Sequence, residues 1–255
     1  MFLIALMFPA MTASASTDTV GVKAGDRAEY DDISFEYASN WPGYEDPISA
    51  YNMSWMDMEV LDVSDSNVTV QSTVIYGNGT EQTDEMSGNI ATGEGNLSVS
   101  IIPSNLGAGD EIPANITWYT EEPLKVVING TVTRSYADAN REVNYVNITY
   151  PIIYGDVQYG TINMSLYWDK KTGIMCEEVM SYAMSYTLPN STHWYMNMSM
   201  MFGMTETNMW SAEVPFWTQW WFWTIIAIVI VALAGTVYFL RKRKPPTSTA
   251  PTSPT

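Results

Sequence analysis

Short stretches of alternating apolar and polar residues dominate the chain from residue 16 to residue 214. In residues 68–76 (VTVQSTVIY), apolar side chains stand at nearly every second position. Ile162, Met164 and Leu166 alternate in the same way with two polar residues. Alternation with a period of two is typical of a β-strand that buries one face and exposes the other. Since no stretch here has the 3.6-residue period of an amphipathic helix, the pattern predicts a β-rich domain.

Turn signals separate these stretches. Residues 65–67 (DSN) and 77–79 (GNG) bound the first run, and residues 168–174 (WDKKTGI) predict a strand, a tight turn and a second strand. Gly173 occupies the turn position that requires a positive φ. Val126, Ile128 and Val132 form a further alternating run, which predicts another strand. The spacing predicts a mostly β fold, either an antiparallel sandwich or a curved half-barrel.

Two longer apolar segments interrupt this pattern, and the first begins the chain. Residues 1–11 (MFLIALMFPAM) are apolar and are followed by small residues that include Ala13 and Ala15. The run is too short to cross a bilayer, and small residues two positions apart are typical of a secretory cleavage site. We therefore expect residues 1–15 to be a signal peptide, although no Lys or Arg precedes the apolar run.

The second apolar segment, residues 216–240, predicts a transmembrane helix. Its last 21 residues would span about 31 Å as a helix, against about 30 Å for a hydrocarbon core. Four tryptophans crowd its start and four cationic residues follow its end, so the positive-inside rule places the C-terminus in the cytoplasm. The residues expected at the membrane interfaces are Trp217, Trp220, Trp221, Trp223, Arg241, Lys242, Arg243 and Lys244. Membrane lipid is thus an expected partner, and the cationic residues act as a stop-transfer anchor.

The distribution of charge agrees with this topology, because acidic residues precede the predicted transmembrane helix and a cluster of cationic residues follows it. The chain carries a net charge of −17, and all 28 acidic residues lie between Asp18 and Glu213. Such a balance lacks the basic surface that nucleic-acid binding needs. Residues 245–255 contain only Pro, Thr, Ser and Ala, so residues 241–255 are expected to form a disordered cytoplasmic tail. The predicted order is signal peptide, exterior β-domain (16–214), transmembrane helix (216–240) and tail.

The exterior region is rich in the glycosylation sequence Asn-x-Ser/Thr. Ten copies occur, where chance would give about three, and all lie in the predicted exterior region. Along a strand, the Asn and its hydroxyl partner point to one face and the middle residue to the other. That middle residue is Met, Val, Leu or Ile in seven copies, so we expect one face of the β-domain to carry glycans. The expected sites are Asn52, Asn67, Asn78, Asn96, Asn115, Asn129, Asn147, Asn163, Asn190 and Asn197.

Candidate metal chemistry rests on the methionines. Met196, Met198 and Met200 would share one strand face, and thioethers suit Cu(I), with Cys176 and His193 near in sequence. The opposing interpretation is that Met fills the core in place of Leu and Ile, and the abundance of Met elsewhere favours it. A chain with one Cys and one His offers no ordinary zinc site. The sequence therefore predicts no metal and no cofactor.

Candidate catalysis rests on paired carboxylates, such as Glu121-Glu122 and Glu177-Glu178. Such pairs serve glycosidases, but they also arise readily in a strongly acidic domain. One His makes a Ser-His-Asp site improbable. We therefore expect a protein that is not an enzyme, with an exported carboxylate hydrolase as the lesser alternative.

Several segments resemble a family of archaeal secreted or membrane-anchored surface domains. Residues 20–26 (VGVKAGD), followed by Tyr30, resemble the opening of these domains, and residues 102–112 (IPSNLGAGDEI), 134–144 (RSYADANREVN) and 167–173 (YWDKKTG) are similar to later blocks. The last segment is also similar to hairpins of curved half-barrels that carry lipoproteins. The family is uncharacterised, so the resemblance implies an envelope setting and carries over no catalytic residue.

These observations together predict a single-pass cell-surface glycoprotein, with its N-terminus outside and its C-terminus in the cytoplasm. Its expected role is structural or recognition-based at the cell envelope, with other envelope proteins as partners. The alternative is a membrane-anchored carrier or sensor that binds a lipid-like or other apolar ligand in a β cavity lined by Met, Trp and Tyr. A deep apolar cavity would favour the carrier, and an exposed aromatic patch would favour recognition.

Overall fold

The fold is described from a computed structural model, which covers residues 20–41, 52–97, 99–116, 124–154, 156–188, 191–212 and 216–242. The expected signal peptide, Asn190, Arg243, Lys244 and the rest of the tail lie outside the described residues. The chain divides into two compact units, residues 1–212 and residues 213–255. We describe each unit by itself.

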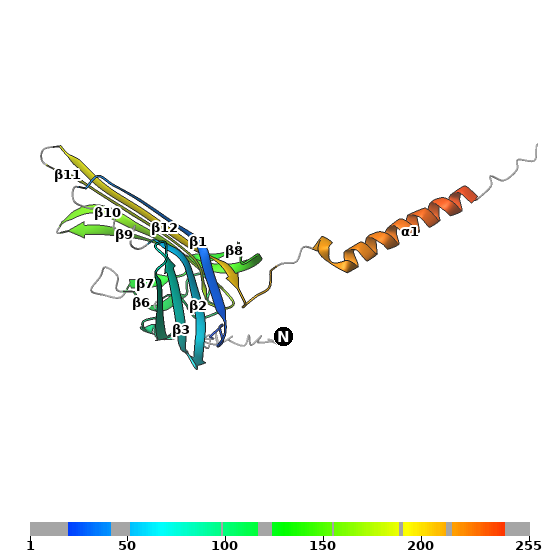
Figure 1. The fold of residues 1–255 in the computed structure, drawn as a ribbon, viewed down its shortest axis with the longest axis horizontal. Helices are drawn as coiled ribbons and strands as arrows, with labels where there is room; N and C mark the ends of the chain where they lie inside the picture. The colour runs from blue at the N-terminus through cyan, green and yellow to red at the C-terminus, as the bar shows by residue number, and fades with distance from the viewer. Residues whose placement is uncertain are drawn as a thin grey trace, which may run out of the picture. The chain divides into compact units, whose positions relative to one another are not determined.

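A ten-stranded antiparallel sheet forms the first unit (Figure 1). Its order is β5-β4-β3-β2-β1-β12-β11-β10-β9-β8, so two meanders meet where β1 pairs with β12. A separate two-stranded sheet contains β6 and β7. The strands are β1 (Arg27–Ser39), β2 (Met53–Ser64), β3 (Asn67–Tyr76), β4 (Glu81–Asn89), β5 (Glu94–Gly95), β6 (Glu111–Ile116), β7 (Leu124–Val127), β8 (Gly130–Tyr136), β9 (Ala139–Tyr154), β10 (Val157–Asp169), β11 (Met175–Thr187) and β12 (His193–Thr207).

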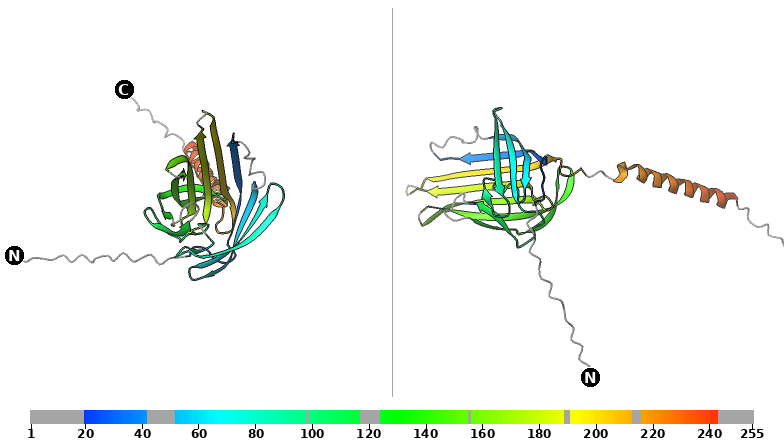
Figure 2. Two further views of the ribbon diagram at one scale, coloured as in Figure 1. Left: turned by 90° about the vertical axis from the view of Figure 1, so that its left-hand side faces the viewer. Right: turned by 90° about the horizontal axis from the view of Figure 1, so that it is seen from below.

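The large sheet bends at β1. This strand pairs with β2 only over Arg27–Tyr30, whereas its pairing with β12 extends from Ala28 to Ser39. Two register shifts between Glu29 and Asp32 interrupt the pairing with β12, and such bulges bend a strand and increase its twist. In Figures 1 and 2, β2 and β3 accordingly run across the direction of β9–β12. The expected mostly β domain is confirmed, and its ten main strands belong to one curved sheet.

The predicted turns form as expected. The segments at residues 65–66 and 77–80 connect β2 to β3 and β3 to β4. At the end of β10, the Asp169 carboxylate accepts hydrogen bonds from the backbone N–H of Lys171 and Thr172, at 3.1 and 2.7 Å. Gly173 has φ +75°. One predicted run is divided: Val126 lies in β7 and Val132 in β8, and Val132 is exposed.

One core lies against the sheet at the end near this turn. Trp168 and Tyr30 are fully buried, and both satisfy their polar atoms with backbone carbonyls. The Trp168 indole N–H donates to Val99 O at 2.7 Å, and the Tyr30 hydroxyl donates to Met175 O at 2.6 Å. The buried Asn144 amide donates to Leu106 O at 2.8 Å. The bonds to Val99 and Leu106 hold the segment between β5 and β6 over the sheet, because a buried polar group without a partner is costly.

The second unit contains one α-helix, α1 (Trp220–Lys242), preceded by a 3₁₀ turn, η1 (Phe216–Thr218). None of its residues is buried, although the helix is long and apolar enough to span a membrane. Arg241 and Lys242 form its last turn, where cations interact favourably with the helix dipole. An unburied apolar helix of this length is consistent with a single membrane anchor.

Gly173→Ala should destabilise the domain more than Gly79→Ala. Both glycines have a positive φ, which costs an alanine about 1 kcal/mol. A Cβ at Gly173 would lie 1.9 Å from Ile102 O, whereas a Cβ at Gly79 would meet nothing within 4 Å. We therefore expect a loss of about 3 kcal/mol or more at Gly173, since overpacking adds to the backbone strain. Thermal unfolding of the full chain in mild detergent measures the difference, and equal losses would contradict the close approach to Ile102.

Candidate functional site: the two faces of the sheet

Strands β1 and β9–β12 extend beyond the core and present two unlike faces. We call the side that bears Leu166 and Trp168 the core face, and the opposite side the outer face. Because paired residues in neighbouring strands point to the same side, the strand register assigns every side chain to one face. The core face is mainly apolar. The outer face is mainly polar but also carries Tyr145, Tyr167, Val179 and Met201 near the core end of the strands.

Apolar and aromatic side chains cover the core face in successive rows across the strands. The first three rows, from the core outward, are Val146-Leu166-Glu178-Phe202-Ile33, Ile148-Met164-Met180-Met200-Phe35 and Tyr150-Ile162-Tyr182-Met198-Tyr37. Leu166, Met164 and Ile162 are buried, whereas Met180, Met198 and Tyr182 are half-buried. The core therefore continues into a broad Met- and Tyr-rich surface. Ring pairs Trp41–Trp194 and Tyr159–Tyr186, at 5.2 and 5.3 Å, lie near the far end of the strands.

Glu178 is the acidic member of this apolar face. Its two cross-strand neighbours are Leu166 and Phe202, and only 9% of Glu178 is exposed. Burial alone raises the pKa of its carboxyl to about 7, with no contribution from a charged neighbour. Within the part of the chain that the structure describes, the carboxyl has no hydrogen-bond partner. Sequence analysis missed this group, although its place in the alternating series Cys176, Glu178, Met180 could have revealed it.

The hydroxyl of Tyr37 is a second polar group without a partner on this face. Across the described ranges, it is the buried side-chain oxygen that makes no hydrogen bond. Tyr37 lies two rows from Glu178, directly beside Met198. A buried hydroxyl without a partner is unusual, because it gives up its bonds to water and gains none.

The outer face of the same strands is polar and carries three sequons. Asn147 of β9 and Asn163 of β10 lie opposite the hydroxyl residues of each other's sequons. The Thr149 hydroxyl donates to Asn163 Oδ1 at 2.9 Å, and the Ser165 hydroxyl donates to Asn147 Oδ1 at 2.8 Å. Asn197 of β12 is on the same face, paired with Ala183 and Ala38. The middle residues of these sequons, Ile148, Met164 and Met198, point to the core face, as predicted.

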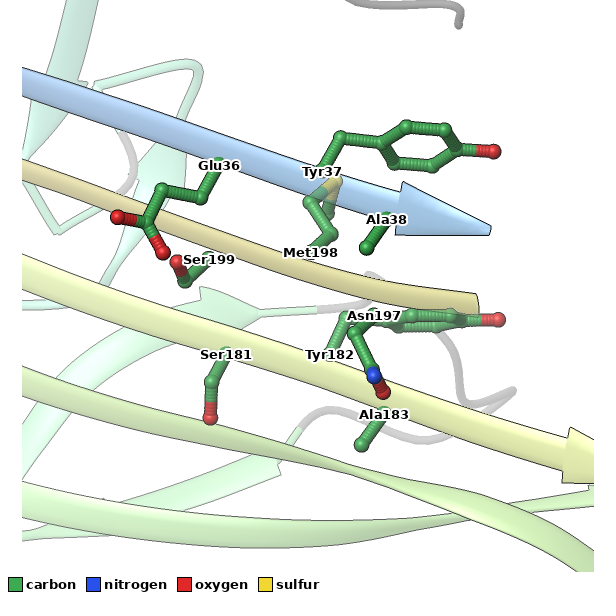
Figure 3. Close-up of a pocket in the computed structure, with 9 residues that line it drawn as sticks. All are labelled: Glu36, Tyr37, Ala38, Ser181, Tyr182, Ala183, Asn197, Met198 and Ser199. Carbon is green, nitrogen blue, oxygen red and sulfur yellow. The ribbon is translucent and has the colours of Figure 1, made fainter. Parts of the chain in front are cut away.

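Small side chains of β1, β11 and β12 leave a shallow trough beside the Asn197 sequon (Figure 3). Its volume is about 620 Å³, and an adjoining one of about 590 Å³ continues past Gly160 and Ser185. Asn197 lines both. In Figure 3, Ser181 and Ala183 point to one side of β11 and the ring of Tyr182 to the other. A Cβ at Gly160 would lie 2.1 Å from Ala183 O, so no larger residue fits there.

Every sequon asparagine whose side chain the structure describes is exposed; Asn115 and Asn190 lie outside this set. The eight exposed residues are Asn52, Asn67, Asn78, Asn96, Asn129, Asn147, Asn163 and Asn197. Six of them accept a hydrogen bond through Oδ1. Counting bonds between described residues, Asn163 alone of these eight donates through Nδ2, over a long 3.5 Å to Ser181.

Asparagines outside sequons behave differently. Nδ2 of Asn40, Asn144 and Asn208 donates to backbone carbonyls at 2.9, 2.8 and 2.7 Å. Nδ2 of Asn89 and Asn105 donates to side chains. Nδ2 is the atom to which an N-glycan is attached. Between described residues, seven of the eight sequon asparagines make no hydrogen bond through this nitrogen, whereas the five asparagines named above use it. Sequence reasoning could not predict this contrast, because it depends on the partners that the fold brings together.

The residues proposed for Cu(I) are only partly assembled. Met196, Met198 and Met200 share the core face, as the alternation predicts, together with Met164, Met180 and Met184. Cys176 is buried at the core end of β11, whereas His193 begins β12 at the other end of the hairpin, opposite Thr187. Eleven residues of strand separate them, or roughly 35 Å. Burial also raises the pKa of the Cys176 thiol, which disfavours the thiolate that a metal requires.

The acidic pairs do not converge in the described part of the domain. Glu177 and Glu178 point to opposite faces of β11, and Glu177 binds Arg134 at 2.7 Å. Arg134 also stacks on the ring of Tyr167, 4.0 Å from its centroid. Asp169 is buried in an ion pair with Arg141 at 2.7 Å. No group of three His, Cys, Asp or Glu suited to a metal occurs among the described residues.

The expected membrane-interface residues that the structure describes lie in or just before α1. Trp220, Trp221 and Trp223 occupy its start and Trp217 lies in η1, all of them exposed. Arg241 and Lys242 are at its end, and Lys242 lies 5.2 Å from the centroid of the Tyr238 ring.

Comparisons with protein-family models, with curated proteins and with solved structures found no match to this chain. The resemblance to archaeal surface domains therefore stays a prediction, and the two faces carry the functional argument.

Glu178→Gln should change how stability depends on pH. The native state keeps a proton on Glu178 up to about pH 7, whereas the unfolded chain releases it near 4.5. The free energy of unfolding therefore falls as pH rises through this window, and above pH 7 the loss is complete. We expect the variant to match wild type near pH 4 and to be more stable by about 3 kcal/mol near pH 8. Glu36→Gln, an exposed carboxyl on the outer face, is the control.

Thermal unfolding of the full chain in mild detergent at the two pH values measures the effect. Both variants remove one negative charge from an acidic domain. The difference between their free energies of unfolding therefore reports the burial of the Glu178 carboxyl rather than general charge repulsion. A Glu178→Gln variant whose stability follows wild type at both pH values would contradict the burial of this group.

Proposed function

We propose that this chain is a single-pass glycoprotein of the cell surface. In this proposal residues 16–214 form an exterior domain that carries N-linked glycans, α1 crosses the cell membrane, and residues 241–255 lie in the cytoplasm. The domain has a structural or recognition role at the envelope, and its setting is that of the archaeal surface domains that the sequence resembles.

The exposure of the described sequon asparagines, whose Nδ2 makes no hydrogen bond to a described residue except in Asn163, carries this proposal. Eight sequon asparagines are exposed, and six hold their side chain in place through Oδ1. A side chain fixed in this way presents its nitrogen to solvent at little further entropic cost. Glycans on Asn147, Asn163 and Asn197 would cover the outer face, and the trough beside Asn197 leaves room for a first sugar.

The charge distribution supports the proposed topology. The acidic residues all precede α1, and Arg241–Lys244 follow its apolar stretch without a break. Exposed tryptophans at the start of α1 suit the membrane interface on the exterior side. Glycans and negative charge would both keep a domain with few lysines soluble.

The carrier or sensor alternative has one observation in its favour. The core face continues past the packed core as a half-buried surface of Met and Tyr, and this surface suits an apolar ligand. The hydrolase alternative gains no such support, since Glu177 and Glu178 point to opposite faces and Glu177 is paired with Arg134.

Intact mass of the native protein tests glycosylation. The unmodified chain has a mass of 28.5 kDa, and the native chain should exceed the mass of its polypeptide by several glycans. Asn163→Gln should remove one glycan. Ser165→Ala should remove the same glycan although Asn163 is still present, and Ser165→Thr should keep it, because only the hydroxyl completes the sequon.

Asn140→Gln is the matched control, because Asn140 is exposed but belongs to no sequon. This variant should keep the wild-type glycan mass. A native protein with the mass of its bare polypeptide would contradict the proposal. A Ser165→Ala variant that carries the same glycan mass as wild type would contradict it too.

A further inference from the structure

The core face holds a polar group that the proposed surface role does not use. Glu178 is 9% exposed and lies between Leu166 and Phe202, with Val146 and Ile33 at the ends of its row. None of these four neighbours can donate a hydrogen bond or supply a positive charge. A carboxyl in such a place is tolerated only at a cost unless something binds it.

Among the residues that the structure describes, no cation pairs with Glu178. Along β11, the next residues on the core face are Cys176 and Met180. The nearby Arg134 binds Glu177 on the opposite face, and Arg141 binds Asp169. Only burial influences the pKa of Glu178. The Glu178 carboxyl is only 9% exposed, and its oxygens are not among the fully buried atoms without a partner, so they still reach the surface of the core face. A positively charged or hydrogen-bond-donating partner would therefore come from outside the domain.

The surface that leads away from Glu178 is suited to a long apolar chain. Met180, Tyr182, Met184 and Tyr186 follow it on the same face of β11, a distance of roughly 27 Å. Met196, Met198 and Met200 line the neighbouring strand. Flexible thioethers adapt to a ligand of irregular shape, and the unpartnered hydroxyl of Tyr37 lies beside them.

We propose that the core face binds a long-chain amphiphile with a protonated amine head, taken from the surrounding membrane. The ammonium group would bind the Glu178 carboxylate, and the hydrocarbon chain would lie along the Met and Tyr residues of β11 and β12. Charge complementarity selects the head, because Glu178 is the acidic residue in this apolar row and a bound ammonium group favours its ionised form. The proposal rests on the proposed membrane anchor only for the source of the ligand.

Photolabelling of the full chain in phosphatidylcholine vesicles tests this. The probe is a hexadecylamine with a diazirine in mid-chain, compared with the same chain bearing a carboxylate or an alcohol head. Peptide mass spectrometry then measures labelling of β11 and β12 and, separately, of α1. We expect the amine to label β11 and β12 about tenfold more than the carboxylate, as one charge-assisted bond allows.

Variants separate the site from general attraction to an acidic domain. Glu178→Gln should fold at least as well as wild type. In this variant, labelling of β11 and β12 by the amine probe should be about tenfold weaker than in wild type. Glu36→Gln removes an equal charge from the outer face and should leave the labelling unchanged.

Equal labelling of β11 and β12 by all three probes, unchanged labelling in Glu178→Gln, or no labelling of these strands would each overturn the binding site. Labelling of α1 reports the anchor independently. An unlabelled α1 beside labelled β11 and β12 contradicts the proposed anchoring but supports the site, and the reverse result contradicts the site alone.

Discussion

The alternation of side chains along a β-strand is the constraint on which this molecule depends. In β1 and β9–β12 it places most Met and aromatic residues on one face and most Asn, Ser, Thr and Ala residues on the other, with Tyr145, Tyr167 and Met201 as exceptions on the polar face. A shift of one residue in any of these strands would move asparagine into the core and methionine into water. The sequon itself, with its polar ends and apolar middle, obeys the same rule. Folding and the proposed glycosylation would thus place the same demand on these strands.

The bend in the sheet determines which part of the core face is covered and which part is exposed. Bulges in β1 at Glu29–Asp32 turn β2–β4 away from β9–β12, and the segment between β5 and β6 covers the core face only near Trp168. Farther along the strands the core face is half-buried, and Glu178 lies at the boundary between the two regions. A single curved sheet therefore combines a packed core, an apolar surface and a polar outer face without a second domain.

Local patterns in the sequence predicted much of this arrangement. Alternation predicted the strands around Val70 and Met164, and the turn sequence predicted a positive φ at Gly173. The length of the apolar segment and the cations that follow it predicted α1. Features that depend on distant pairing were not predictable. The run from Val126 to Val132 divides between two sheets because β7 pairs with β6 whereas β8 pairs with β9. The apolar neighbours of Glu178 become evident only when β10 and β12 are placed beside β11. The contrast in Nδ2 use among the asparagines likewise depends on tertiary hydrogen bonds.

Cysteine labelling along β11 on intact cells tests the two-faced exterior domain most directly. The native Cys176 is buried and its raised pKa keeps it unreactive, so the background is low. A membrane-impermeant maleimide should react quickly with Ser181→Cys, Ala183→Cys and Ser185→Cys, and slowly with Met180→Cys and Tyr182→Cys, without lysis of the cells. Uniform reactivity along the strand would contradict the division into two faces, and reaction only after lysis would contradict the exterior placement.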